Sequence, residues 1–462
     1  MRSRGAYRAA LLVWTVAAGG CATLGPNRGR ADTDQLLRSR GNPALEWSPS
    51  PAADADAARL RGQPMTPVNA VQMALLRSPR LQQEYARLGL VRADVEEALQ
   101  LANPRLDVSR ISGAGLVKST VGLAMPLVDL LVLPRRARLA RADAERATAE
   151  IAAAILVVTA EVESGWYDYV GAQQIAGMRA TVASGMATSA ELAQRFFDAG
   201  NITELQLRQE QAAASQARIE AARARAAAQR ARLELNTRIG LSGADAEWPV
   251  SAHLPSPVAE EDATDLLETI SRNTNLRLMA ARQEVVVMED ALGVARRFRF
   301  LGGTEIGVER ERETDGQRLT GPTLALELPI FNQGEARVTS AQAQLAQARA
   351  RLAGIELAAD NAVRLGAERV RVLREIIETH RDALIPQRES VVARSQEQQN
   401  YMIIGVFELI QAKRQEYDAY QSYLEAIRDY WLARTELMHA VGARLPSESA
   451  VTRPSDPQGG GR

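Results

Sequence analysis

Residues 320–345 read TGPTLALELPIFNQGEARVTSAQAQL, and this stretch decides the fold. In its first half apolar and polar residues alternate, which is the pattern of a β-strand with one apolar and one polar face. The two sets are Leu324, Leu326 and Leu328 on one face, and Thr323, Ala325 and Glu327 on the other. After a polar turn, an Ala- and Gln-rich run favours a helix. The chain is expected to be mostly helical, yet it contains strands in which one face favours an apolar environment and the other favours water.

The chain contains an internal repeat, with copies at residues 67–250 and 251–442. Each copy has a short helical segment, a helix of roughly twenty residues, a strand pair and a long helical hairpin. The strands are expected at about 105–126, where the first is RLDVSRISG at 105–113, and at about 302–329, and the hairpins are expected at about 135–240 and 335–441. The sequence therefore predicts a mainly α fold with a small β part that occurs twice.

The helical hairpins are too long for a globular domain. If 135–198 is one helix, it is about 95 Å long at about 1.5 Å per residue, so it belongs to a coiled coil or a tube. Gly200 and Gly405 are predicted to take positive φ and reverse the chain in the two copies. Pro386 is expected to kink the second hairpin.

Composition argues against several classes of function. The chain has 56 basic and 56 acidic residues, which gives no electrostatic reason to expect nucleic acid as a partner. It has one cysteine and three scattered histidines, and no HExxH, GxSxG or P-loop motif. We therefore predict no catalytic residue, no metal site and no cofactor, and we expect that the protein is not an enzyme.

The N-terminus is typical of an exported protein. Arg2, Arg4 and Arg8 precede a short apolar stretch, which predicts a signal peptide over 1–20. Its end looks like a bacterial lipoprotein signal, in which Cys21 becomes the mature N-terminus and carries lipid such as palmitate. The alternative is an ordinary secretory signal with an incidental cysteine. Residues 21–66 are interpreted as a linker or irregular collar, and 443–462 as a disordered tail.

The strand pairs fit a transmembrane β-barrel with lipid outside and water inside, because strands of nine to eleven alternating residues are typical of such barrels. Glu305, Glu309, Thr323 and Glu327 are predicted to face the water-filled lumen. The alternative is a pair of hairpins that cap a soluble helical domain. Four strands cannot close a barrel, and every strand edge in lipid must be paired. We therefore expect a homotrimer with about twelve strands.

The repeat, the hairpin turns and the run LELPIFNQGEAR resemble the TolC-like outer membrane efflux proteins, and CATLGP at 21–26 resembles the start of their lipoprotein members. The resemblance covers about residues 66–442. It implies a trimeric twelve-stranded barrel on a periplasmic α-helical barrel. It also implies docking onto a periplasmic adaptor and an inner membrane pump. The residues that it places at the periplasmic tip are Ala199, Gly200, Asn201, Ile202, Ile404, Gly405, Val406 and Phe407.

The resulting hypothesis is a lipid-anchored channel of the bacterial outer membrane that extends into the periplasm. It would passively conduct drugs, metal ions or other small molecules, with the energy supplied by the pump. One alternative is a periplasmic adaptor or coiled-coil structural lipoprotein without a pore, although adaptors usually have one helical hairpin rather than two. A lipid-anchored enzyme is the other alternative, and the lack of a catalytic motif argues against it.

Overall fold

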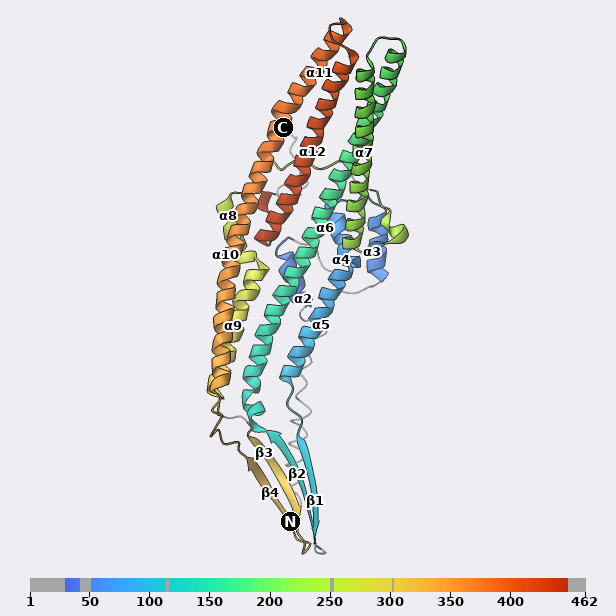
Figure 1. Cartoon of the computed structure of the whole chain (residues 1–462). Coiled ribbons are helices and arrows are strands. Elements are labelled where there is room, and N and C mark those ends of the chain that lie inside the picture. The colour runs from blue at the N-terminus through green and yellow to red at the C-terminus, as the bar shows by residue number, and fades with distance from the viewer. Residues whose placement is uncertain (1–29, 42–50, 114–115, 250–252, 301–302, 448–462) are drawn as a thin grey trace, which may run out of the picture. The chain divides into compact units, whose positions relative to one another are not determined.

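The computed structural model describes residues 30–41, 51–113, 116–249, 253–300 and 303–447 (Figure 1). The predicted signal peptide and Cys21 lie outside the described residues. The chain divides into two compact units. The first is built from Ala86–Glu150 and Met279–Gly354, and the second from Leu36–Tyr85, Ile151–Leu278 and the described part of Ile355–Arg462.

The first unit contains one antiparallel sheet of four strands in the order β1-β2-β3-β4 (Figure 1). The strands are β1 Arg105–Gly113, β2 Leu116–Pro126, β3 Glu305–Arg312 and β4 Arg318–Ala325. The two predicted strand pairs therefore form, and β2 joins them by pairing with β3. Repeat copies that are distant in sequence thus contribute to one sheet.

Strand β1 has the predicted bounds, but β4 ends at Ala325, four residues before the predicted end. The cause is pairing: Ala325 is opposite Glu305, which is the first residue of β3. Among the described residues, no strand continues beyond Glu305 to pair with Leu326 and Leu328. Glu327 therefore lies just after the strand that was predicted to contain it.

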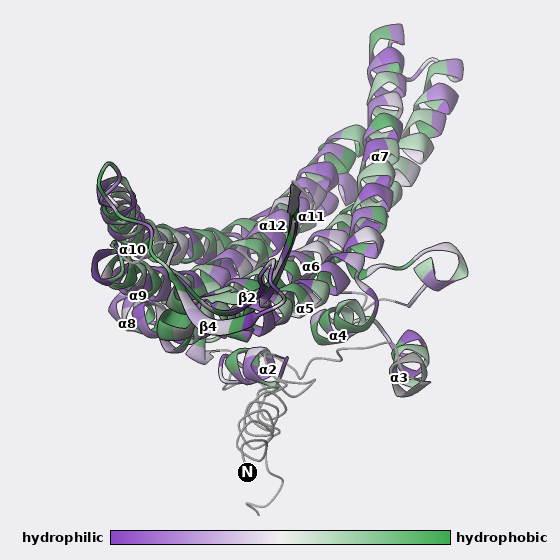
Figure 2. Cartoon of the chain, turned by 90° about the horizontal axis from the view of Figure 1, so that it is seen from below, coloured by the Kyte–Doolittle hydropathy of each residue, from purple (hydrophilic) through white to green (hydrophobic). Residues whose placement is uncertain are grey.

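Two helices follow the short segments of the repeat, as predicted. They are α5 Pro79–Leu99 and α9 Leu276–Arg297, preceded by the short helices α4 Pro67–Arg77 and α8 Thr264–Thr274. In the first unit Leu292 of α9 packs against Ala341 and Leu345. Val285, Met288 and Val338 pack against the same cluster. Figure 2 shows hydrophobic and hydrophilic residues interspersed along these helices.

The long helices are α6 Leu127–Asp198, α7 Glu204–Ile239, α10 Glu335–Thr379, α11 Ile385–Asn400 and α12 Val406–Val441. Helix α6 begins eight residues earlier than the predicted start at 135 and contains Pro134. Helices α10 and α11 are separated by a π-helical turn, His380–Leu384. Pro386 has no N–H to donate to the carbonyl four residues before it, so the helix absorbs the proline through a wider turn instead of ending.

The repeat is visible in how the returning helices end. Gly240 caps α7 and Gly442 caps α12, and both adopt left-handed backbone conformations with φ of 89° and 79°. Gly240 lies against the carbonyl of Arg77 at the end of α4, and Gly442 lies against Asn275 at the end of α8. An added Cβ at either glycine would overlap with that backbone. Both copies therefore use a glycine where the backbone is left-handed and the packing is closest.

Two flanking segments differ from the sequence predictions. The predicted collar contains two regular helices, α2 Arg30–Arg38 and α3 Pro51–Arg61. The first residues of the predicted tail make specific contacts, because Leu445 is buried and Arg444 pairs with Glu163 at 2.5 Å. The rest of that tail lies outside the described residues. In the part of the chain that the structure describes, no helix is long and apolar enough to cross a membrane.

Candidate functional site

The sheet has two chemically different faces, and the strand register determines which residues share each face. Directly opposed residues of antiparallel strands point to the same side. Glu305 is opposite Ala325, Thr323 is opposite Gly307, and Glu309 is opposite Gly321. Glu305, Glu309 and Thr323 therefore lie on one face, which we call the polar face. Their joint placement agrees with the sequence pattern, and Glu327 follows two residues after Ala325.

Both basic residues on the polar face are in ion pairs. Arg105 of β1 bonds to Asp107 at 3.2 Å and reaches Glu305 on β3 at 2.9 Å. Lys118 of β2 pairs with Glu311 of β3. Acidic residues outnumber basic ones on this face, so it is a hydrated surface with a net negative charge.

The opposite face, which we call the apolar face, exposes large hydrophobic side chains in every strand. A soluble protein rarely exposes a contiguous apolar patch of this kind to water. The exposed residues are Leu106 (63%), Val108 (68%), Leu123 (52%), Val308 (55%) and Leu324 (60%). The acidic residues of the strands and these exposed large apolar side chains therefore lie on opposite faces of the sheet.

The turn between α6 and α7 ends the first hairpin. Gly200 has φ of 75°, as predicted. The amide of Asn201 donates to the carbonyl of Phe196, and the amide of Gly200 donates to that of Phe197, both at 2.8 Å. This is a Schellman motif, in which a left-handed residue allows two amides to satisfy the last carbonyls of a helix. Thr203 then caps α7.

The turn between α11 and α12 has the same form but a different residue at the left-handed position. Met402 has φ of 61°, and its amide donates to the carbonyl of Gln399, while the amide of Ile403 donates to that of Gln398. Gly405 has φ of −78° and is the N-cap of α12. The prediction that Gly405 takes positive φ is therefore wrong. Gly405 corresponds to Thr203, and Met402 corresponds to Gly200.

This correspondence shifts the second turn toward the N-terminus. Ile404 and Gly405 lie in the turn as predicted, but Val406 and Phe407 are the first residues of α12. The turn residues that the sequence prediction missed are Tyr401, Met402 and Ile403, which are 79%, 92% and 70% exposed. The signal for them was available, because three consecutive large apolar residues directly precede Ile404 and Gly405.

An aromatic contact joins the two hairpins close to their turns. The rings of Phe196 on α6 and Phe407 on α12 meet edge to face, with centroids 6.1 Å apart. Edge-to-face pairs of this kind contribute about 0.5–1.5 kcal/mol beyond the buried area. Below it, Val182 and Met186 of α6 pack against Ala214 and Ala217 of α7. Ile410 and Tyr417 of α12 pack against the same cluster, so the two hairpins also meet there.

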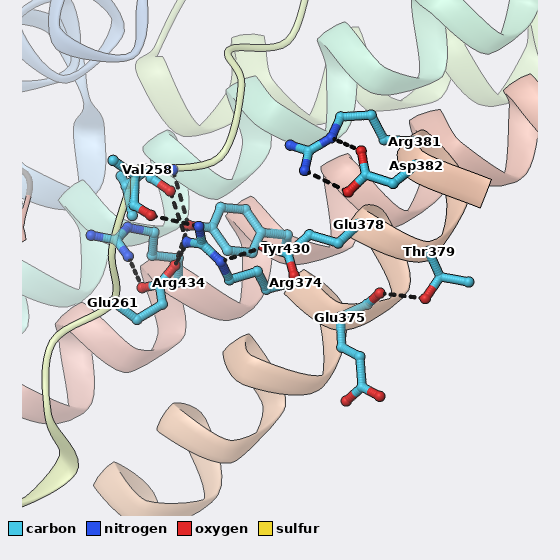
Figure 3. Close-up of polar contacts among 11 residues, drawn as sticks. Val258, Glu261, Arg374, Glu375, Glu378, Thr379, Arg381, Asp382, Tyr430 and Arg434 are labelled. Atoms are coloured by element: carbon cyan, nitrogen blue, oxygen red, sulfur yellow. Dashed lines mark hydrogen bonds and ion pairs between the residues drawn. The ribbon is translucent and has the colours of Figure 1, made fainter. Parts of the chain in front are cut away.

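A buried polar cluster holds the connection between the two repeats, residues 254–262, against α10 and α12 (Figure 3). Glu261 pairs with Arg434, whose side chain is only 1% exposed, and accepts a hydrogen bond from the Tyr430 hydroxyl at 2.5 Å. Arg374 donates to the carbonyls of Val258 and Ala259 at 2.8 and 2.6 Å. Burial, followed by the bond to Glu261, raises the pKa of Tyr430, so the hydroxyl stays a donor.

The same cluster extends to the C-terminal end of the described chain. Arg434 donates to the Ser447 hydroxyl at 2.5 Å, and that hydroxyl donates to Asp262 at 2.5 Å. Sequence reasoning did not find this cluster because its members come from distant parts of the chain, with Glu261 and Arg434 173 residues apart. In the described residues, no group of three or more His, Cys, Asp or Glu side chains could hold a metal ion.

Comparison with solved structures identifies the fold. The chain is similar to a membrane protein from Pseudomonas aeruginosa, with a TM-score of 0.66 and 21% identity over 86% of this chain and 96% of that one. It is similar to CusC, with a TM-score of 0.68 and 14% identity over 87% and 98%. It is also similar to the outer membrane protein VceC from Vibrio cholerae, with a TM-score of 0.65 and 16% identity over 84% and 96%.

No protein-family profile matches the sequence, and no curated protein sequence matches it significantly. The structural similarity nevertheless extends over nearly the whole length of the solved chains. Such neighbours combine an α-barrel with a β-barrel. The fold class predicted from the sequence is therefore confirmed, with the strands of one chain forming an open four-stranded sheet.

Proposed function

We propose that this chain, whose fold is that of the TolC-family outer membrane channels, is one subunit of a trimeric outer membrane channel. The channel would passively conduct small molecules from a periplasmic adaptor and an inner membrane pump to the exterior. The observation that carries the proposal is the register of the sheet, which places all the acidic residues of the strands on one face and the exposed Leu106, Leu123, Val308 and Leu324 on the other.

The open edges of the sheet support the trimer. Strands β1 and β4 each have a neighbour on one side only within this chain. Unpaired backbone groups in lipid cost several kcal/mol each, so both edges need partner strands. Three copies that pair β4 of one chain with β1 of the next give about twelve strands, which is enough for a water-filled lumen.

The helical turns support an adaptor as partner. The turn residues 401–403 are large, apolar and exposed, which is typical of a protein–protein contact. Met402 is held in a left-handed conformation that costs about 1–2 kcal/mol in a residue with a side chain, and such strain often accompanies function. We infer that an adaptor binds the two turns. Opening would then require the contact between Phe196 and Phe407 to break.

Passive conduction can be tested in planar bilayers together with the mass of the purified species. We expect long-lived conducting events from a species of three chains. A monomeric, non-conducting protein would contradict the proposal.

A matched pair of variants tests the assignment of the two faces. Leu123→Lys places a charge on the apolar face and is expected to cost about 2–4 kcal/mol of insertion energy, whereas Thr120→Lys places it on the polar face. Leu123→Lys should abolish insertion into outer membranes, and Thr120→Lys should insert and alter ion selectivity. Equal insertion of both variants would refute the assignment.

A further inference from the structure

The apolar face of the sheet carries an unexpected rank of arginines. Arg110 of β1 is opposite Ser119 of β2, which is opposite Arg312 of β3, which is opposite Arg318 of β4. These four positions form one rank across the sheet. The same alternation places the rank on the face of Leu106, Leu123 and Val308. All three arginines are exposed.

The acidic residues of the strands all lie on the polar face. Within the four strands, the apolar face carries four arginines and no acidic residue: Arg110, Arg310, Arg312 and Arg318. The polar face carries Arg105 and Lys118 together with Asp107, Glu305, Glu309 and Glu311, and both of its cations are paired. Within the described residues, the side chains of these four arginines form no ion pair or hydrogen bond, and only their backbones are bonded in the sheet.

The rank also contains a like-charge contact. Arg312 and Arg318 are directly opposed on neighbouring strands, and like charges in that position are destabilising. Opposed residues have Cα atoms about 4.5–5.5 Å apart, so both guanidinium groups can reach one anion. An anion between them would turn the repulsion into two charge-assisted contacts. Arginine is suited to phosphate because its planar group can form two parallel hydrogen bonds.

The position of the rank indicates the source of the anion. The rank lies toward the β-turns, at the end of the strands away from their junctions with α5, α6, α9 and α10 (Figure 1). From Arg318 in the rank, β4 runs to Ala325. At about 3.3 Å per residue and a tilt of about 40°, these seven steps span about 18 Å in height, which is most of the roughly 25 Å apolar band of a membrane barrel, so the rank lies at one border of that band.

We propose that Arg110, Arg312 and Arg318 bind phosphate-bearing lipid headgroups in the leaflet at the turn end of the strands, with Arg312 and Arg318 sharing one phosphate. This inference rests on the proposed function, because the strands must lie in a membrane. It adds a lipid partner and a specific site. The rank would fix the depth of the strands in the bilayer. The bound phosphate would neutralise the repulsion between Arg312 and Arg318.

The test measures lipid binding by native mass spectrometry of the full-length protein in a neutral detergent. The probe is phosphatidic acid, with phosphatidylcholine as the reference lipid and inorganic phosphate as a competitor. We expect Arg312→Gln with Arg318→Gln to weaken phosphatidic acid binding about 10-fold or more, since each cation near a lipid headgroup contributes about 1 kcal/mol. Arg223→Gln with Arg225→Gln on α7 removes the same charge from another exposed surface and should leave binding unchanged.

Arg110→Gln alone provides a milder variant in case the double variant does not fold, and it should lose a smaller part of the affinity. Undiminished binding in folded Arg312→Gln/Arg318→Gln protein would overturn the proposal. Displacement of the lipid by millimolar inorganic phosphate would overturn the assignment to lipid and leave a free-anion site. Conductance of the wild type in phosphatidylcholine bilayers separates the two levels: a conducting protein without selective lipid binding defeats only this inference, and a non-conducting one defeats the proposed function.

Discussion

The pair of Glu261 and Arg434 offers a sharp test of how the beginning of the second repeat is held against α12. Arg434 is 1% exposed and its guanidinium pairs with Glu261. Glu261→Gln keeps an acceptor for the Tyr430 hydroxyl but removes the negative charge. The buried cation then loses its counter-charge, and breaking a buried pair in this way costs about 3–5 kcal/mol.

The expected effect is local, because Glu261 belongs to the connection between the repeats. If about 4 kcal/mol is lost from the opening of residues 258–262, the open state becomes about 10³-fold more populated. Hydrogen exchange of peptides that cover this segment measures the change. The amide of Val258, which donates to the Tyr430 hydroxyl at 3.3 Å, should exchange about 10²–10³-fold faster.

Two further variants complete this experiment. Glu260→Gln removes the same charge from an exposed neighbour and should leave exchange unchanged. Glu261→Gln combined with Arg434→Met removes both charges and should recover most of the lost protection, because no unpaired cation remains buried. Wild-type protection in Glu261→Gln would refute the reasoning, since it would mean that Arg434 does not depend on this carboxylate.

Three other substitutions have expected outcomes. Gly240→Ala should lower the melting temperature of the purified protein strongly, because the added Cβ would overlap the carbonyl of Arg77. Gly243 is also left-handed but has open space around it, so Gly243→Ala should cost only about 1 kcal/mol. Equal losses of stability in the two variants would contradict the packing argument. Burial lowers the pKa of His439 below its ordinary 6.5, so its neutral form is favoured in the fold and stability should be full above about pH 6.5 and fall as the pH drops below it. His439→Gln should flatten the dependence of melting temperature on pH in that range, and an unchanged slope would exclude His439 as its source. Met402→Gly should relieve the left-handed strain and raise the melting temperature slightly while weakening adaptor binding, and unimpaired binding would show that the Met402 side chain is not part of that contact.

The sequence predicted the elements that depend on local patterns. The alternation of apolar and polar residues located all four strands, and β1 has the predicted bounds. This pattern has a period of two that does not depend on what the strand packs against. The left-handed turn at Gly200 could be predicted because glycine has no Cβ and adopts positive φ readily. The repeat predicted the matching order of helices in both copies for the same reason, since each copy carries its own local signals.

Only the tertiary structure decided the features that depend on partners. The second turn was assigned to Gly405, but the left-handed residue is Met402, where the amides of Met402 and Ile403 donate to the last carbonyls of α11. The end of β4 at Ala325 depends on where β3 begins, and the approach of Glu261 to Arg434 depends on contacts across 173 residues of chain.

The arginine rank shows the division most clearly. Each arginine is visible in the sequence, but one strand gives no information about which residues of its neighbours lie opposite. The strand register brings Arg110, Arg312 and Arg318 into line. The sequence by itself determined that the strands have an apolar and a polar face, because that property belongs to each strand alone. The tertiary structure decided which charges share a face and lack partners, because electrostatic energy depends on distances between strands.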